Sequence, residues 1–230
     1  MPGPTPRFTI SDGYARYRGP TAGGGPLHRH GAFQIAIVAG GDVAMVDADG
    51  LRHQGQALVV APLAPHRILA AADLLIYYVD PHCAFADSLR QHHGSGVTVA
   101  PELRDLCDDD LGPAGLRSSI DLDPRLTEAL NILSANNFPI PTVAAMVGLS
   151  PQRLRALARS QLGLPLTRWR VWSRLRRAAE ALQLGHSLAD SALAAGFADQ
   201  AHLTRQMREM MGLTPAVVLP ILRGQPLRAT

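Results

Sequence analysis

Three histidines and a glutamine in the N-terminal half have the types and spacing needed to bind a metal ion. His28, His30 and Gln34 are two and four residues apart, so in an extended strand their side chains point the same way. A further histidine, His66, precedes a later apolar strand. Three imidazoles and one amide oxygen that converge form a reasonable transition-metal site. The same four side chains are alternatively polar groups lining an effector pocket, and the sequence leaves both interpretations open.

A second set of residues, in the C-terminal half, is suited to reading DNA bases. Arg can donate two hydrogen bonds to guanine, and Gln can pair with adenine. These residues follow two short apolar segments, each ended by a turn glycine, Gly148 or Gly196, and a helix N-cap, Ser150 or Asp199. This order is typical of helix-turn-helix units, whose second helix enters the major groove. The expected reading residues are Gln152, Arg153, Arg155, Gln200, His202, Thr204 and Arg205.

The charge distribution favours a polyanionic partner for the C-terminal half. The 230-residue chain has a net charge of +3, but residues 1–123 hold 14 acidic residues and 9 Arg. Residues 124–230 hold 13 Arg and 5 acidic residues, and eight of these Arg lie between Arg153 and Arg177. Such a surface suits double-stranded DNA. We expect the following side chains to contact phosphates or to pair internally: Arg168, Arg170, Arg174, Arg176 and Arg177.

The elements that position these residues differ between the two halves. Short apolar runs at 33–39, 43–46, 57–61 and 74–79, separated by turn signals such as Asp49-Gly50, predict a small antiparallel barrel or sandwich. Short helices are expected at 84–92 and 101–109. Beyond Pro124 the apolar spacing predicts helices at 124–135, 140–147, 151–162, 165–184, 187–194, 199–211 and 215–222. Their expected core includes Leu154, Leu157, Leu193, Phe197 and Leu203.

These patterns predict an α+β protein with more than one domain. We expect a loose N-terminal tail at 1–20, a sensor domain at 21–111, a linker at 112–123, a DNA-binding domain at 124–222 and a C-terminal tail at 223–230. No apolar run approaches the ~18 residues that span a membrane. Two cysteines, Cys83 and Cys107, are too few for a disulfide framework. The expected location is the cytoplasm, with no membrane partner.

Residues 124–222 resemble the DNA-binding domain of the AraC/XylS family of bacterial transcription regulators. Ala158, Leu203 and Met207 stand where that family usually has aromatic residues, and all three are apolar core-type substitutions. The resemblance implies a regulator that binds promoter DNA through two helix-turn-helix units. It also implies contact with RNA polymerase if the protein is an activator, and it leaves a homodimer open. The matching residues are Arg174-Leu175, Ala178, Leu182, Leu188-Ala189, Ala192, Ala195-Gly196-Phe197, His202-Leu203, Arg205 and Gly212-Leu-Thr-Pro215.

The histidine segment is similar to the two motifs of the cupin family. Gln34 takes the place of a glutamate in the first motif, Gly41 follows at the family's spacing, and the second motif, ending at His66, is one residue short. The resemblance implies a cupin-like barrel that senses a small molecule or a divalent transition metal. The alternative is a metal-dependent cupin enzyme with an appended helical domain. Because the glutamate and a clear general acid–base pair are missing, we expect no catalytic residues and no enzyme.

Overall fold

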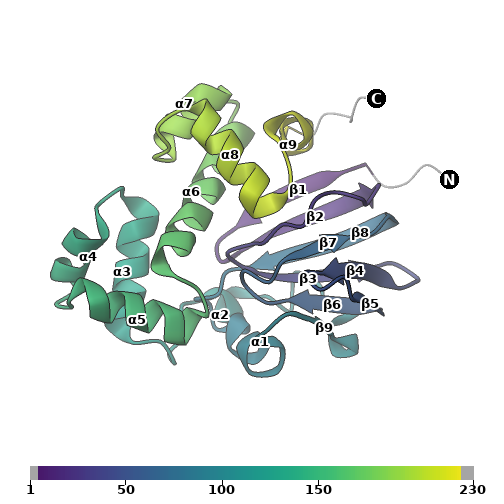
Figure 1. Cartoon of the computed structure of the whole chain (residues 1–230), viewed down its shortest axis with the longest axis horizontal. Helices are drawn as coiled ribbons and strands as arrows, with labels where there is room; N and C mark the ends of the chain where they lie inside the picture. Colours follow the sequence, from purple (N-terminus) through teal and green to yellow (C-terminus); the bar gives the residue numbers. More distant parts are fainter. Residues whose placement is uncertain (1–4, 224–230) are drawn as a thin grey trace.

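The computed structural model describes residues 5–223, and it places antiparallel sheets before a group of helices (Figure 1). The larger sheet has the strand order β1-β2-β8-β3-β6-β9 and the smaller one the order β5-β4-β7. The strands are β1 (Arg7–Ser11), β2 (Tyr14–Thr21), β3 (Phe33–Val38), β4 (Val43–Asp47), β5 (Arg52–Gly55), β6 (Ala57–Val60), β7 (His66–Ile68), β8 (Ala71–Val79) and β9 (Val97–Val99).

The two sheets are open. All strand pairs are antiparallel, but within residues 5–223 β1 and β9 remain the edges of the larger sheet, and β5 and β7 those of the smaller. The prediction of antiparallel strands is therefore confirmed. The predicted closed barrel is not, because the described strands form two open sheets. Closure would require a ladder between the outer strands, and each edge strand has only one partner in its sheet.

The prediction of a loose tail over residues 1–20 is wrong for residues 7–20. Residues 7–21 form the β1–β2 hairpin, in which Phe8 pairs with Tyr17 and Ile10 with Ala15. The turn is Asp12-Gly13, and Gly13 has a φ of +78°, a value that the second central residue of a type II turn adopts and that favours glycine. Strand β2 then pairs along β8 and is buried at Tyr14 and Ala15. Residues 1–4 lie outside the described residues, as does the predicted C-terminal tail at 223–230 except for Arg223.

The helices of the C-terminal half confirm the prediction made from apolar spacing, because the ends of all seven lie within one or two residues of the predicted ones. In the first half, the predicted helix at 101–109 is only a 3₁₀ turn over Pro101–Leu103, and the short helix α2 lies in the predicted linker. The helices are α1 (Phe85–His93), α2 (Pro113–Leu116), α3 (Pro124–Ala135), α4 (Ile140–Met146), α5 (Pro151–Leu162), α6 (Leu166–Gln183), α7 (Leu188–Ala194), α8 (Gln200–Met211) and α9 (Pro215–Leu222).

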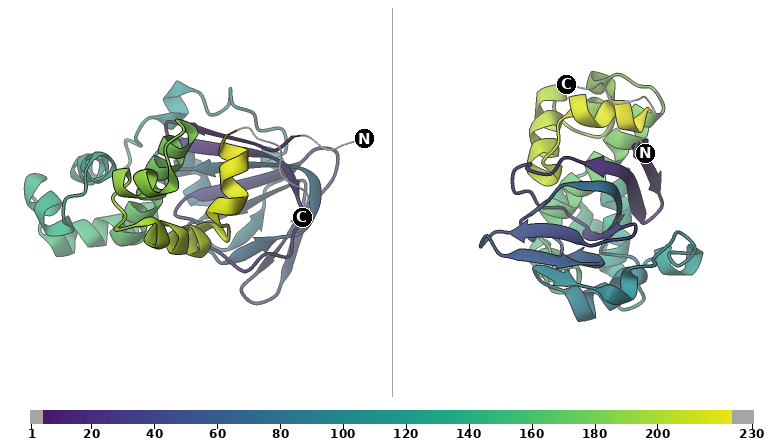
Figure 2. Two further views of the ribbon diagram at one scale, coloured as in Figure 1. Left: turned by 90° about the horizontal axis from the view of Figure 1, so that it is seen from above. Right: turned by 90° about the vertical axis from the view of Figure 1, so that its right-hand side faces the viewer.

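The larger sheet is buried on both faces because alternate residues of its strands face different cores. Along β8, Tyr77 and Val79 join a cluster with α1, whereas Ile76 and Tyr78 join a cluster that continues into the helical domain. Helix α9 packs against β1, and the left view of Figure 2 shows α9 (yellow) over the strands and the other helices of the C-terminal half to one side of them. One of the two clusters is therefore a core that the sheets share with the helices of the C-terminal half.

A buried polar contact fastens α6 to the sheets. The carboxylate of Asp80, which directly follows β8 and is 2% exposed, accepts a hydrogen bond from the Trp172 indole Nε1 at 2.8 Å and pairs with Arg176. Arg176 also donates to the Ser11 carbonyl at 2.5 Å. Because a buried charge is stable only when it is paired and hydrogen-bonded, these contacts set the position of α6 on the sheets.

Gly31 provides a test of this docking. A Cβ atom built on Gly31 would lie 2.7 Å from the Trp172 Cβ, so the close approach of α6 to this backbone segment needs a glycine. We expect Gly31→Ala to lower the free energy of unfolding by about 1–2 kcal/mol, as overpacking does, in a urea titration. Gly41→Ala is the control, because its Cβ would meet only Val38 at 4.0 Å. Equal stability of the two variants would contradict tight docking at Gly31.

Candidate functional site

Two helix pairs carry the residues predicted to read DNA. Helices α4 and α5 are joined through Gly148, and helices α7 and α8 through Gly196, with φ values of +67° and +85°. The side chain of Ser150 accepts from the Arg153 amide at 3.1 Å, and Asp199 accepts from the His202 amide at 2.6 Å. Each second helix is therefore capped by the predicted N-cap residue.

The structure separates the predicted reading residues into two groups. Five are exposed and leave their side chains available, namely Gln152, Arg153, Arg155, Gln200 and Arg205. His202 and Thr204 are half-buried. The His202 ring packs edge-on against Phe197, and the Thr204 hydroxyl donates to the Gln200 carbonyl at 2.9 Å. These two side chains already serve the local structure of α8, so the exposed group is the stronger candidate for contact with a ligand.

Several arginines of the basic segment pair within the protein. Besides Arg176, Arg168 pairs with Glu209 at 2.5 Å, and Arg177 donates to the Ala195 carbonyl at 3.0 Å. Burial and the neighbouring charges of Arg170 and Arg177 lower the pKa of Arg174. Internal pairing thus explains part of the charge run, while Arg153, Arg155 and Arg205 make no ion pair among the described residues.

The histidines predicted to converge do so. A pair of backbone hydrogen bonds of 2.9 and 3.0 Å joins His28 to His66, which starts β7, and His30 lies beside them. Their ring centroids are 4.6 to 5.2 Å apart, and each ring offers a nitrogen within 4.8 Å of the others. Gln34 of β3 joins this histidine cluster, with its Oε1 3.1 Å from the His66 Nε2. The geometry brings together all four predicted residues.

One hydrogen bond of the histidine cluster fixes the donor atom of His28. Its Nδ1 lies 3.2 Å from the Pro26 carbonyl, so in the neutral ring Nδ1 donates and Nε2 carries a lone pair. Both nitrogens of His66 face an oxygen: Nδ1 lies 3.0 Å from the Ala64 carbonyl and Nε2 lies 3.1 Å from the Gln34 Oε1. Burial, and then the charge of His28, lower the pKa of His66 to about 4. Burial lowers the pKa of His30 still more clearly, although the backbone of Met210 and the side chain of Gln34 face its ring and act in the opposite direction. The cluster thus presents neutral imidazoles, the form that binds metals.

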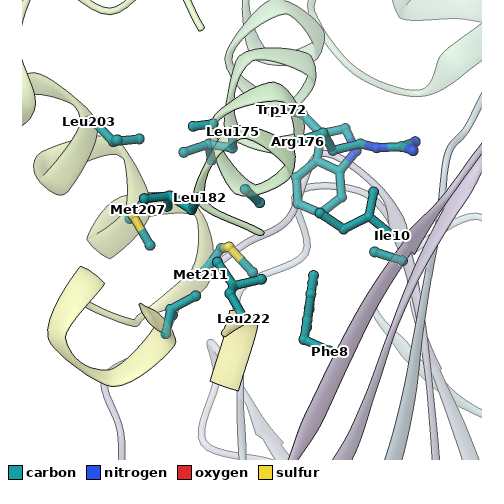
Figure 3. Close-up of a pocket in the computed structure, with 14 residues that line it drawn as sticks. Phe8, Ile10, Trp172, Leu175, Arg176, Leu182, Leu203, Met207, Met211 and Leu222 are labelled. Carbon is teal, nitrogen blue, oxygen red and sulfur yellow. The ribbon is translucent and has the colours of Figure 1, made fainter. Parts of the chain in front are cut away.

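A cavity of about 370 Å³ lies beside the histidine cluster, between the sheets and the last two helices. Its walls are mostly apolar, and Arg67 is the one cation among its lining residues, which include no carboxylate. A smaller cavity of about 40 Å³ lies deeper, between β1 and helices α6, α8 and α9 (Figure 3). The sequence did not predict a cavity shared by both domains. Lining residues of the larger cavity include Phe8, Tyr17, His28, Arg67, Ile76, Tyr78, Met211, Val218 and Ile221.

Comparisons with known proteins agree with the helical part and with the overall arrangement. Residues 143–219 match a family model described as a helix-turn-helix domain. The arabinose operon regulatory protein of Escherichia coli is 34% identical over 100 residues, which cover 41% of this chain and only about a third (34%) of that relative. Among the described residues, no helix has the length and apolar character needed to cross a membrane.

Solved structures of ToxT from Vibrio cholerae share the fold of the whole chain. The structure from strain O395 has a TM-score of 0.61 at 10% identity and covers 93% of this chain and 100% of ToxT. The structure of ToxT from strain SCE256 bound to an unsaturated fatty acid has a TM-score of 0.60 at 11% identity, covering 99% and 100%. At these identities the likeness concerns the fold: antiparallel sheets followed by a helical domain.

Proposed function

Because the C-terminal domain of this chain belongs to the AraC type, we propose that the protein is a sequence-specific, DNA-binding transcription regulator controlled by its N-terminal domain. The observation that carries this proposal is the repeated helix pair with its exposed Arg and Gln side chains. Helix α6 holds the two pairs together, since it contacts α5, α7 and α8. The promoter is the partner that such a surface recognises.

The two helix pairs act as two helix-turn-helix units on one face of the DNA. Helices α5 and α8 would enter successive major-groove segments, about 10 bp apart. Arg153, Arg155 and Arg205 are suited to guanine, and Gln152 and Gln200 to adenine. His202 and Thr204 contribute less to base recognition, because the His202 ring packs on Phe197 and the Thr204 hydroxyl donates to the Gln200 carbonyl.

A selection from random genomic fragments tests this function. The full-length protein is incubated with fragments at one fixed salt concentration, with and without EDTA, and bound DNA is sequenced. The proposal expects a discrete motif that spans two adjacent groove segments, and its arrangement in one or two copies reports whether the protein binds as a dimer. Binding that depends on salt but not on sequence, under both conditions, would contradict the proposal.

The cavity supports a small-molecule effector with an apolar body and an anionic head. Apolar side chains surround it, Arg67 supplies a cation, and the residues from α8 and α9 place the DNA-binding domain in its wall. ToxT, which shares this fold, has been solved with a bound unsaturated fatty acid. An amphipathic carboxylate in this cupin-like sensor domain would contact both domains at once. Its binding would therefore favour one arrangement of the two.

Arg67→Ala tests the identity of the head group. We expect this variant to bind decanoate about 10-fold more weakly than the unchanged protein, because a charge-assisted hydrogen bond contributes roughly 1.5–3 kcal/mol when buried and less at the partly open cavity mouth. Isothermal titration calorimetry measures the change. Arg52→Ala, an exposed arginine of β5 outside the cavity, is the control. Equal loss in both variants, or none in either, would contradict the assignment of Arg67.

The alternative function, a metal-dependent cupin enzyme, is not favoured by the comparisons. Residues 143–219 match a helix-turn-helix domain, and the matching relative is the arabinose operon regulatory protein of Escherichia coli. DNA binding also explains why the C-terminal half contains two helix pairs with capped second helices, whereas an enzymatic function would not explain them.

A further inference from the structure

The loop that leads into the first helix pair touches the turn of the second pair. This loop, residues 136–139, joins α3 to α4, and its Asn137 lies against Gly196, the glycine between α7 and α8. A Cβ atom built on Gly196 would lie only 2.1 Å from the Asn137 Oδ1. A Cβ atom on Gly148, the turn glycine of the first pair, would meet no described atom within 4 Å. The missing side chain at Gly196 therefore makes room for Asn137.

Arg177 of α6 fastens this contact. Its Nη2 atom donates to the Asn137 Oδ1 at 3.2 Å and to the Ala195 carbonyl at 3.0 Å. Ala195 ends α7, where a helix leaves its last carbonyls without partners, so the guanidinium also caps that helix. One side chain thus joins three elements: the loop 136–139, α6 and the α7–α8 turn. We call the contact among Asn137, Arg177 and Gly196 the inter-unit contact.

The position of Asn137 is coupled to the first reading helix, α5. Pro139 directly precedes α4 with a φ of −60°, and a proline restricts the backbone of the residue before it as well. The turn from α4 into α5 is closed by a hydrogen bond of 2.8 Å from the Leu149 amide to the Ala144 carbonyl. Because these segments are short and constrained, the inter-unit contact acts on the placement of α5 relative to α8.

Helix α6 alone would leave the two helix pairs free to rotate against each other. It contacts α3 and α5 on the side of the first pair, and α7 and α8 on the side of the second (Figure 1). Helices that pack through side chains can slide on one another by small amounts. The inter-unit contact joins the loop 136–139 directly to the α7–α8 turn, so that neither pair can rotate on α6 without breaking it.

We propose that Asn137 is a positioning residue: held by Arg177 against Gly196, it fixes the angle between the two helix pairs and so restricts the protein to one spacing of the two groove segments. The restriction on spacing rests on the proposed DNA-binding function, whereas the fixed angle does not. Asn137 itself need not touch DNA, because it acts through the placement of α5 and α8.

The spacing is tested by fluorescence anisotropy on the selected motif and on versions with one base pair inserted or removed between the two segments. One base pair turns a groove segment by about 35° and shifts it by about 3.4 Å. We expect these changes to weaken binding about fivefold less in full-length Asn137→Ala than in the unchanged protein, which corresponds to the loss of roughly one hydrogen bond.

Two matched variants show whether the acceptor oxygen of Asn137 is responsible. Asn137→Asp keeps that oxygen and should keep the strict spacing. Asn136→Ala is the control, because the Asn136 amide donates to the Ile132 carbonyl of its own helix, α3, at 3.2 Å. The same spacing penalty in Asn137→Ala as in the unchanged protein would overturn the proposal, as would relaxed spacing in Asn137→Asp or Asn136→Ala.

The fixed angle is tested without DNA, by double electron–electron resonance between spin labels on α5 and α8. Ala156→Cys and Ala201→Cys, both at exposed positions, carry the labels, and Cys107→Ser removes the exposed native thiol. We expect one narrow distance distribution in this labelled protein and a broader one when Asn137→Ala is added. Identical distributions would overturn the proposal. Absence of sequence-specific DNA binding would reject the proposed function instead, and the distance measurement would still decide whether the inter-unit contact fixes the angle.

Discussion

Replacing Asp80 by alanine is expected to lower the free energy of unfolding by about 3–5 kcal/mol, the cost of removing one member of a buried ion pair. The variant leaves the Arg176 guanidinium, whose side chain is 16% exposed, without its carboxylate, and the Trp172 indole without its acceptor. Because these groups join α6 to the sheets, the loss should also loosen the contact between the two domains. A urea titration measures the stability, and limited proteolysis at the linker measures the loosening.

Two further variants distinguish the effect of breaking the buried ion pair from the effect of breaking an exposed one. Asp80→Ala combined with Arg176→Met should be more stable than Asp80→Ala alone, because the unpaired buried charge is gone. Asp73→Ala breaks a more exposed pair with Arg18 and should cost about 1 kcal/mol or less. If Asp73→Ala and Asp80→Ala had equal effects, the Asp80 contact would not be what holds α6 in place.

Replacing Arg205 by alanine should weaken specific DNA binding by about 1–3 kcal/mol, or roughly 5- to 150-fold, and relax the preference at one position of the site. Arg205 is exposed on α8 and makes no ion pair among the described residues, so its guanidinium is free to contact a base. Fluorescence anisotropy on the selected motif, and on single-base variants of it, measures both effects at one salt concentration.

Arg104→Ala is the matched control for the change in net charge, because Arg104 is an exposed arginine of the N-terminal domain. This variant should bind DNA as the unchanged protein does. A uniform loss on all sequences in Arg205→Ala, with a smaller salt dependence, would assign Arg205 to a phosphate. Unchanged binding would remove it from the DNA interface.

The helices were predictable because local signals define them. Ser150 and Asp199 cap the second helices as expected, and Leu154, Leu157, Phe197 and Leu203 are buried as their spacing predicts. The prediction was wrong at Leu193, which is 61% exposed on α7. Helix α7 is only two turns long, and a short helix on the surface buries a narrower face than its apolar residues suggest.

The sheets were harder to predict because their pairing is not local. The Asp12-Gly13 turn was a usable hairpin signal for β1 and β2, but strands β5, β7 and β9 are only three or four residues long. The convergence of His28, His30 and Gln34 was expected from alternation along one strand, and His66 was added from its place near the start of a later strand. In the structure only Gln34 of the first three lies in a strand, β3, and His28 reaches His66 through an isolated bridge. Their contact with the end of α8, about 180 residues away from His28 in sequence, depends on how the domains dock, and no local pattern encodes that.

The shared core has a practical consequence for work with fragments of this protein. A piece that begins at Pro124 would keep both helix pairs but expose Trp172, which packs on Gly31 and Asp80 in the whole chain, together with the apolar residues of α8 and α9 that wall the cavities. Exposed apolar patches of this kind promote self-association. Joining the helical half to a different N-terminal domain would therefore require that domain to carry the same packing surface: the β1–β2 hairpin and the segment around Asp80.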